Sequence, residues 1–516
     1  MRKKLSLLFC AVLLLSFILS SGAAFAKAPD RKVSATSTTW YLAEGSTGVD
    51  ATGYFDTFIL LANQNATAAT VTVTYQLETS SISSHPFTLP ADSRTTISVS
   101  DDLAVMLPAT GGHVWSVSTK VSSDIPIVAE RAEYWTDNHV NAVKGVQRQA
   151  ATECIGVTNT NAIWYLAEGS THVGPDGSFE TWILVQNPGA TAAHVSMFYE
   201  TPSGEVVGPV FTLAPGTRRS ISIGNTLPAT DSISTIVNSD VGVVAERAMY
   251  WSNPTVRRVS GHDSVGVTAA APLWYMPACS MQGWTQITDW PYVLVQNPQA
   301  FAVNVTLKYM TVAQAGEVAT VHDVATVSLP AKTRYTFNVR SYLTSPSLQY
   351  LTAVVQADAP VIAEKSDYKN YFDGATRITM EQASGSNGLT ATSNNWLLAE
   401  GSTATSTINN IIYGFETYIW ICNPTGDAAT VNVTFLLPSG PVAIPAFSLP
   451  AYTLVIVHAN DYVPNQWSVS TKVTSNKALV TERIMYWSQP GVSSLPSPTL
   501  PVGYGDQTSS VGVATD

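Results

Sequence analysis

Residues 58–75 read FILLANQNATAATVTVTY, and closely related stretches occur three more times in this 516-residue chain. Each copy has an apolar run, a turn that begins with Asn, and a run in which apolar and polar residues alternate. This pattern predicts an apolar strand, a turn and a second strand with period-two alternation. The other copies are WILVQNPGATAAHVSMFY at 182–199, YVLVQNPQAFAVNVTLKY at 292–309 and YIWICNPTGDAATVNVTF at 418–435.

Three further motifs recur in the same order. WYLAEGST stands at 40–47 and 164–171, and WLLAEGST at 396–403. FTLPADSRTTISV at 87–99 returns at 211–223, 327–339 and 447–459, and IVAERAEYW at 127–135 returns at 243–251 and 479–487, with a divergent VIAEKSDYK at 361–369. The nearly constant spacing, seen in Glu130, Glu246, Glu364 and Glu482, is that of a whole domain rather than of a solenoid unit.

The repeat defines the domain plan. Every copy has about seven short strand candidates separated by Pro, Gly, Asn and Asp, and no copy shows sustained helical periodicity. This pattern predicts an all-β chain of four tandem antiparallel sandwiches of immunoglobulin-like type, with a closed barrel as the alternative. The segments around SVGV, which precede each new copy, should close the domain before them. We expect a signal peptide at 1–26 and repeats one to four at 27–160, 161–270, 271–392 and 393–516.

Composition and the N-terminus point to export. A basic start, an apolar run and Ala24-Phe25-Ala26 are typical of a cleaved signal peptide, and no later segment is long and apolar enough to span a membrane. Only 12% of residues are charged, and the net charge of −11 without a basic stripe argues against nucleic-acid binding. The three cysteines after the signal segment fit neither a disulfide framework nor a zinc site.

Together the WYLAEGST, FDTFILLAN, TLPA-x-SR and PIVAERAxYW motifs resemble a bacterial family of secreted or cell-surface β-sandwich repeats of unknown function. The resemblance covers nearly all of the mature chain. It implies tandem β-sandwich modules on an exported, often surface-associated protein. It brings no active site that could be transferred to this chain.

Three charged positions recur in repeats one, two and four. All three are changed in repeat three, where Ala278 replaces the glutamate of the AEGS motif and Lys365 replaces the arginine of the Glu-Arg motif. The sequence therefore predicts that the three side chains contact one another. We expect the arginine to bridge the two acids within each repeat as a partly buried ion-pair cluster, as in Arg131 with Glu44 and Asp56. The nine residues are Glu44, Asp56 and Arg131, Glu168, Glu180 and Arg247, and Glu400, Glu416 and Arg483.

Two chemical alternatives compete with a structural cluster. Paired carboxylates can form a glycosidase site, but an active site is rarely built three times in one chain, and an arginine would hold both acids ionised. Calcium ligation by Glu44 and Asp56 is opposed by the same arginine, and the spacing matches no calcium loop. We therefore expect no catalytic residues, no metal and no cofactor.

Recurrent tryptophans leave a binding alternative open. They either fill the core of each copy or, if exposed, stack on sugar rings or partner surfaces. Repeat three adds the aromatic and polar stretch CSMQGWTQITDWPY at 279–292, where specialised binding could have arisen. The candidate binding aromatics are Trp40, Trp135, Trp164, Trp251, Trp284 and Trp290.

The sequence thus favours an exported, non-enzymatic structural or adhesive protein of the cell surface. Its partners would be surface glycans or other surface proteins. Carbohydrate binding through exposed aromatics is the second hypothesis, and a secreted glycan-active enzyme the third. Short polar linkers such as residues 383–395 suggest modules strung like beads with limited freedom.

Overall fold

The computed structural model describes residues 36–49, 53–107, 114–137, 150–254, 257–281, 287–313, 319–345, 348–373, 376–408, 411–487 and 506–515. The expected signal peptide at 1–26 lies outside the described residues. The described chain is nearly all β-structure in antiparallel sheets, as the sequence predicts. None of its helices has the length and apolar character needed to cross a membrane.

Seven strand positions, here called A to G, are shared by the four repeats. Position A holds β1 (Ser37–Leu42), β11 (Asn161–Leu166), β19 (Ala271–Ser280) and β26 (Ser393–Leu398). Position B holds β3 (Gly53–Asn63), β13 (Gly177–Asn187), β20 (Ile287–Asn297) and β28 (Ile411–Asn423). Position C holds β4 (Ala69–Gln76), β14 (Ala193–Thr201), β21 (Val303–Val312) and β29 (Ala429–Leu437). Position D holds β5 (Ser81–Ser83) with β6 (Phe87–Leu89), β15 (Gly204–Leu213), β22 (His322–Leu329), and β30 (Gly440–Ala443) with β31 (Phe447–Leu449).

The last three positions carry the charged motifs and the end of each repeat. Position E holds β7 (Ser93–Ser98), β16 (Thr217–Ser222), β23 (Thr333–Asn338) and β32 (Thr453–His458). Position F, the strand of the Glu-Arg motif, holds β9 (Ser118–Asp137), β17 (Ser234–Ser252), β24 (Tyr350–Asp373) and β33 (Ser470–Trp487). Position G holds β10 (Ala150–Ile155), β18 (Ser260–Val265), β25 (Thr376–Asn387) and β34 (Asp506–Val511).

Strand F runs through both layers of each repeat. In repeat two, residues 234–239 of β17 pair with β11 and β14, whereas residues 244–252 pair with β13 and β18. The layers are therefore E-B-F-G and A-F-C-D, and apolar side chains from both fill the space between them. This sandwich-like arrangement differs from the immunoglobulin order, in which A, B, E and D form one sheet and C, F and G the other.

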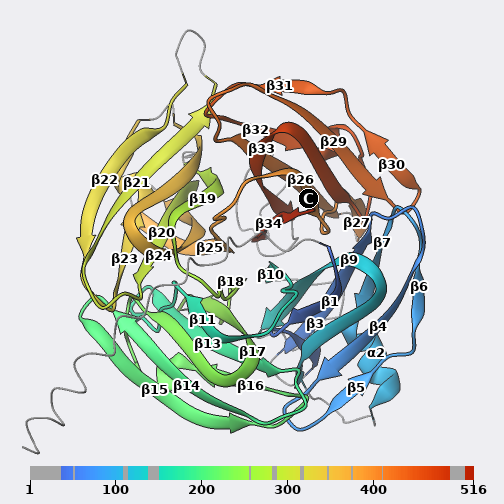
Figure 1. The fold of residues 1–516 in the computed structure, drawn as a ribbon, viewed down its shortest axis with the longest axis horizontal. Helices are drawn as coiled ribbons and strands as arrows, with labels where there is room; N and C mark the ends of the chain where they lie inside the picture. The colour runs from blue at the N-terminus through green and yellow to red at the C-terminus, as the bar shows by residue number, and fades with distance from the viewer. Residues whose placement is uncertain are drawn as a thin grey trace, which may run out of the picture.

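The closing strands behave as the sequence predicts, because each pairs with strand F of its own repeat. They also have a role that the sequence did not suggest. Figure 1 shows the four repeats around a closed ring, with β10, β18, β25 and β34 near its centre, and each of these strands contacts the next. The expectation of beads on a string is therefore wrong: within the expected linker, residues 383–387 belong to the central strand β25.

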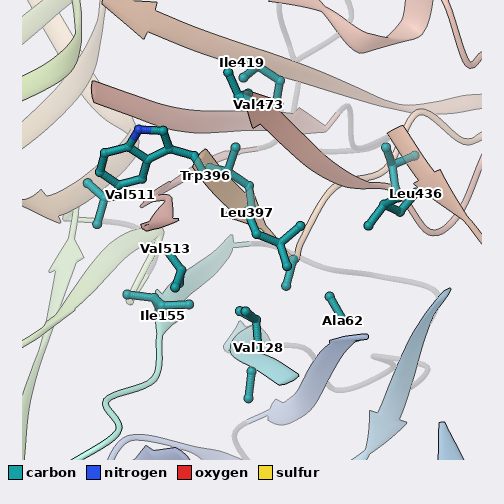
Figure 2. Close-up of a cluster of buried hydrophobic side chains, with 14 of the residues drawn as sticks. Ala62, Val128, Ile155, Trp396, Leu397, Ile419, Leu436, Val473, Val511 and Val513 are labelled. Carbon is teal, nitrogen blue, oxygen red and sulfur yellow. The ribbon is translucent and has the colours of Figure 1, made fainter. Parts of the chain in front are cut away.

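The two ends of the chain meet in one apolar cluster. Ala62, Val128 and Ile155 of repeat one lie with Trp396 and Leu397 of repeat four (Figure 2). The boundary between repeats three and four has an additional link, since β21 and β32 pair in parallel over two residues. Apolar packing, which is the largest favourable contribution to folding, thus continues across the ring closure.

Candidate functional site: the charged boundaries between repeats

The Glu-Arg pair of strand F spans two boundaries of the ring. Adjacent residues on a strand point to opposite faces, and in this ring the two faces meet two different repeats. Glu130 accepts hydrogen bonds from the backbone of repeat four, whereas Arg131 reaches Glu246 of repeat two at 3.2 Å. Each repeat therefore presents a glutamate to the preceding repeat and a cation to the next.

This cation-to-glutamate contact is repeated around the ring. Arg247 lies 3.4 Å from Glu364, and Lys365 lies 2.7 Å from Glu482. The fourth contact, between repeats four and one, is the electrostatic interaction of Arg483 with Glu130. Burial lowers the pKa of Arg483 to about 10, and the negative charge of Glu130 opposes that decrease. The equivalent dipeptide, Glu-Arg in three repeats and Glu-Lys in repeat three, thus serves every boundary.

The glutamates also bind the AEGS turn of the preceding repeat. Two backbone N–H groups, those of Ala43 and Glu44, donate to Glu246 at 2.8 and 2.9 Å. Ala399 and Glu400 donate to Glu130 at 2.9 Å each. Charge-assisted bonds to backbone N–H groups are among the stronger hydrogen bonds in proteins. At the other two boundaries one such bond is present, from Ala167 to Glu364 and from Ala278 to Glu482, each at 3.0 Å.

The predicted bridge within a repeat occurs only in repeat two, where Arg247 lies 3.2 Å from Glu168. Arg131 instead pairs with Glu246 and Asp263 of repeat two, and Arg483 pairs with Glu153 of repeat one. The physical reason lies in the closing strands. Repeats two and one place Asp263 and Glu153 at a position where repeats three and four have Gly385 and Ser509. Where that acid is missing, the preceding cation pairs within its own repeat, as Arg247 does with Glu168 and Lys365 with Asp367.

The AEGS glutamates have partners that the sequence analysis missed. Glu400 lies 2.9 Å from Arg94 on β7, and Glu44 lies 4.0 Å from Arg218 on β16, in both cases across a boundary. Burial raises the pKa of Glu168, but His262, Arg247 and Arg334 lower it below its ordinary value. The sequence holds a sign of this pairing. Repeat four has Leu454 where the other repeats have Arg94, Arg218 and Arg334, and it faces repeat three, which has Ala278 in place of the AEGS glutamate.

The acids of the F-[DE]-T motif lie opposite the tyrosine that follows the strand-F arginine by three residues. Asp56 is opposite Tyr134, three residues along the strand from Arg131, which is about 10 Å. Glu180 lies 3.0 Å from Arg258 at a half-buried position, and Glu416 accepts a hydrogen bond from Tyr418 at 3.0 Å. The prediction that the arginine of each repeat also binds the acid of the F-[DE]-T motif is therefore wrong.

A pair of carboxyl groups shares the boundary between repeats one and two. The Tyr250 hydroxyl lies 3.5 Å from Glu44 and 3.4 Å from Glu133, and all three side chains are buried. Burial and the charge of Glu44 raise the pKa of Glu133 to about 8. At neutral pH this site therefore retains a proton. Ser46 N–H donates to Glu133 at 2.5 Å, which holds the carboxyl against the AEGS turn.

The motif tryptophans are core residues rather than a binding surface. Trp40, Trp135, Trp164 and Trp251 are all buried, so their proposed role as exposed platforms is wrong. The indole N–H of Trp40 donates to Ile127 O at 2.9 Å, and Trp164 donates to Val243 O at 2.8 Å. These bonds offset the cost of burying the polar N–H of the indole. Trp290 is half-buried with Arg340 over its ring at 5.9 Å, and Trp284 lies outside the described residues.

Comparisons with known proteins do not identify a relative. No family model matches the chain, and no curated protein matches it. A crystal structure titled Thermotoga maritima 1070 is similar over 21% of this chain and 94% of its own, with 14% identity and a TM-score of 0.19. The Anabaena sensory rhodopsin transducer is similar over 17% and 95%, with 20% identity and a TM-score of 0.15. A glycoside hydrolase family 32 structure from Bifidobacterium adolescentis covers 85% and 98%, with 8% identity and a TM-score of 0.14. Scores this low support no inference about function.

Proposed function

We propose that this chain is an exported, non-catalytic structural or adhesive protein of the bacterial cell surface, built as a ring of four sandwich modules. One observation carries the proposal: the charged residues that recur most faithfully lie at the boundaries between repeats. Glu246, for example, binds two backbone N–H groups and Arg131 at once. Buried groups that are engaged in this way stabilise the assembly and are not presented to a substrate.

The module count, the signal peptide and the surface location rest on the sequence. Four copies of each motif support four modules, and the basic, apolar and A-x-A segments at 1–26 support cleavage after Ala26. The low charge content suits a polar but weakly charged outer surface. The second hypothesis, sugar binding through the motif tryptophans, loses its basis because those side chains are buried.

Fractionation of the native cells tests the proposal. We expect the protein in the surface or extracellular fraction, with an N-terminus at Lys27 by terminal sequencing. A variant with Ala24 and Ala26 changed to Arg should stay inside the cell at its full length, whereas a matched change at the exposed Val105 should be exported normally. Recovery of the unprocessed chain from the cytoplasm of wild-type cells would contradict the proposal.

A further inference from the structure

Trp467 differs from every other tryptophan whose side chain the structure describes. It is 61% exposed, while those others are buried or half-buried. Its ring stands edge-on to Phe415, with centroids 5.9 Å apart. Its indole N–H has no hydrogen bond within the described residues, in contrast to Trp40 and Trp396, whose N–H groups donate to backbone oxygens. The face of the ring and its donor are therefore both available.

The loop that carries Trp467 is held rigidly by the AEGST segment of its own repeat. Thr403 N–H donates to Gln466 O at 2.8 Å, and Asn465 N–H donates to Thr403 O at 3.0 Å. The Thr403 hydroxyl accepts from Gln466 N–H at 3.0 Å, and Asn465 Oδ1 accepts from Thr405 N–H at 3.1 Å. Asn465 adopts a left-handed φ of 58°, which asparagine tolerates better than most residues. A ligand would meet an aromatic surface that is already ordered, so binding would cost little ordering entropy.

The fold does not require a tryptophan at this place. Repeat two has the exposed Asp231 there, which lies 2.6 Å from His172, and repeat three has the exposed Gln349. Repeat one has Trp115, but it is half-buried and packs against the core cluster. Among these four positions, only that of repeat four presents an exposed aromatic ring to solvent.

We propose that Trp467 is a stacking platform for a pyranose ring, so that repeat four binds a surface polysaccharide. The apolar C–H face of a sugar matches an exposed indole, and its hydroxyls match the indole N–H and the exposed side chains of Asn465 and Thr405. This polar surround favours a saccharide over an apolar protein side chain. The inference rests on the proposed surface location, because it assumes that the ring meets glycans there.

Pull-down of the full mature chain with insoluble chitin, cellulose and peptidoglycan sacculi tests this site. We expect retention on at least one of these probes and a loss of tenfold or more in W467A. The control F301A removes an aromatic side chain that is 51% exposed in repeat three and should bind like the wild type. Equal retention of W467A, or no retention of the wild type on any probe, would overturn the proposal.

Two further readouts separate the possible failures. The thermal midpoint of W467A should equal that of the wild type, because the side chain is exposed, so a loss of retention cannot come from unfolding. If sedimentation shows concentration-dependent dimers that W467A abolishes, the platform contacts a second copy and the saccharide proposal fails. Export and N-terminal processing do not depend on Trp467. The fractionation experiment therefore tests the proposed function independently of saccharide binding by Trp467.

Discussion

Replacing Ala278 by glutamate should destabilise the ring strongly, and a second change at Leu454 should reverse most of the loss. Both residues lie buried in one apolar cluster at the boundary between repeats three and four. A278E would bury a carboxylate opposite a leucine, and L454R would bury a guanidinium opposite an alanine. An uncompensated buried charge costs roughly 3–5 kcal/mol, so each single variant should lose about that much.

The double variant A278E/L454R recreates the pair that the other boundaries have. Arg94 and Glu400 form it at 2.9 Å with both side chains buried. Because the introduced glutamate and arginine can form an ion pair, we expect the unfolding free energy of the double variant to be within about 1–2 kcal/mol of the wild-type value. The coupling energy between the two positions would then be several kcal/mol. Guanidinium unfolding of the four proteins, followed by tryptophan fluorescence, measures each free energy.

The control cycle uses A278E with R340M, since Arg340 belongs to repeat three and contacts Asp289 O and Met281 O instead of the boundary. That pair should be additive. Losses that simply add in A278E/L454R as well would refute the assignment of these positions as partners. Acid offers an internal check, because protonation below about pH 4 should remove much of the penalty of A278E alone.

Other consequences follow from individual contacts. The R94M variant should lose roughly 3–5 kcal/mol of unfolding free energy because it removes one member of the buried Arg94–Glu400 ion pair. E180Q should change the unfolding free energy by less than about 0.5 kcal/mol because Glu180 is half-exposed. Chemical unfolding of both variants compares them directly. The pKa of Glu133 is raised to about 8 in the folded state, so its contribution to stability should be complete below about pH 4.5 and decline as pH rises to about 8. E133Q should therefore flatten the dependence of unfolding free energy on pH in this range. An unchanged slope would contradict the raised pKa. W40F should cost about 1–2 kcal/mol in thermal or chemical unfolding, since Ile127 O loses its donor and a small cavity remains.

The repeat motifs predict the strands well and the site only partly. Residues 58–75 contain two strands separated by a turn as expected, and each pairs antiparallel with β9, in a different layer. The opposite orientation of Glu130 and Arg131 also follows from strand geometry, and the structure shows it. What local pattern cannot show is that the second face of the strand meets another repeat. Local pattern alone therefore predicts a partner of Arg131 within its own repeat, whereas Glu246 and Asp263 of repeat two are its partners.

The ring closure explains why the motifs had to be copied so faithfully. Each boundary is heterologous, with the AEGS turn or its counterpart in repeat three on one side and the Glu-Arg or Glu-Lys strand on the other, and such interfaces form a closed ring or an open filament. The fourth repeat completes the ring with the first, as Glu400 and Arg94 show. Carrying all four units on one chain makes closure intramolecular, which favours it over association between chains.

Identical boundaries would still permit the wrong repeats to meet. The apolar pair of Ala278 and Leu454 breaks that symmetry, because Leu454 beside any AEGS glutamate would leave a buried carboxylate without its arginine. Repeat four is thereby directed to follow repeat three, and Arg94 is left for Glu400. The boundary between repeats three and four thus keeps the Lys365–Glu482 pair but has an apolar contact where the other three boundaries have an arginine and a glutamate, and this difference disfavours the wrong pairing of repeats.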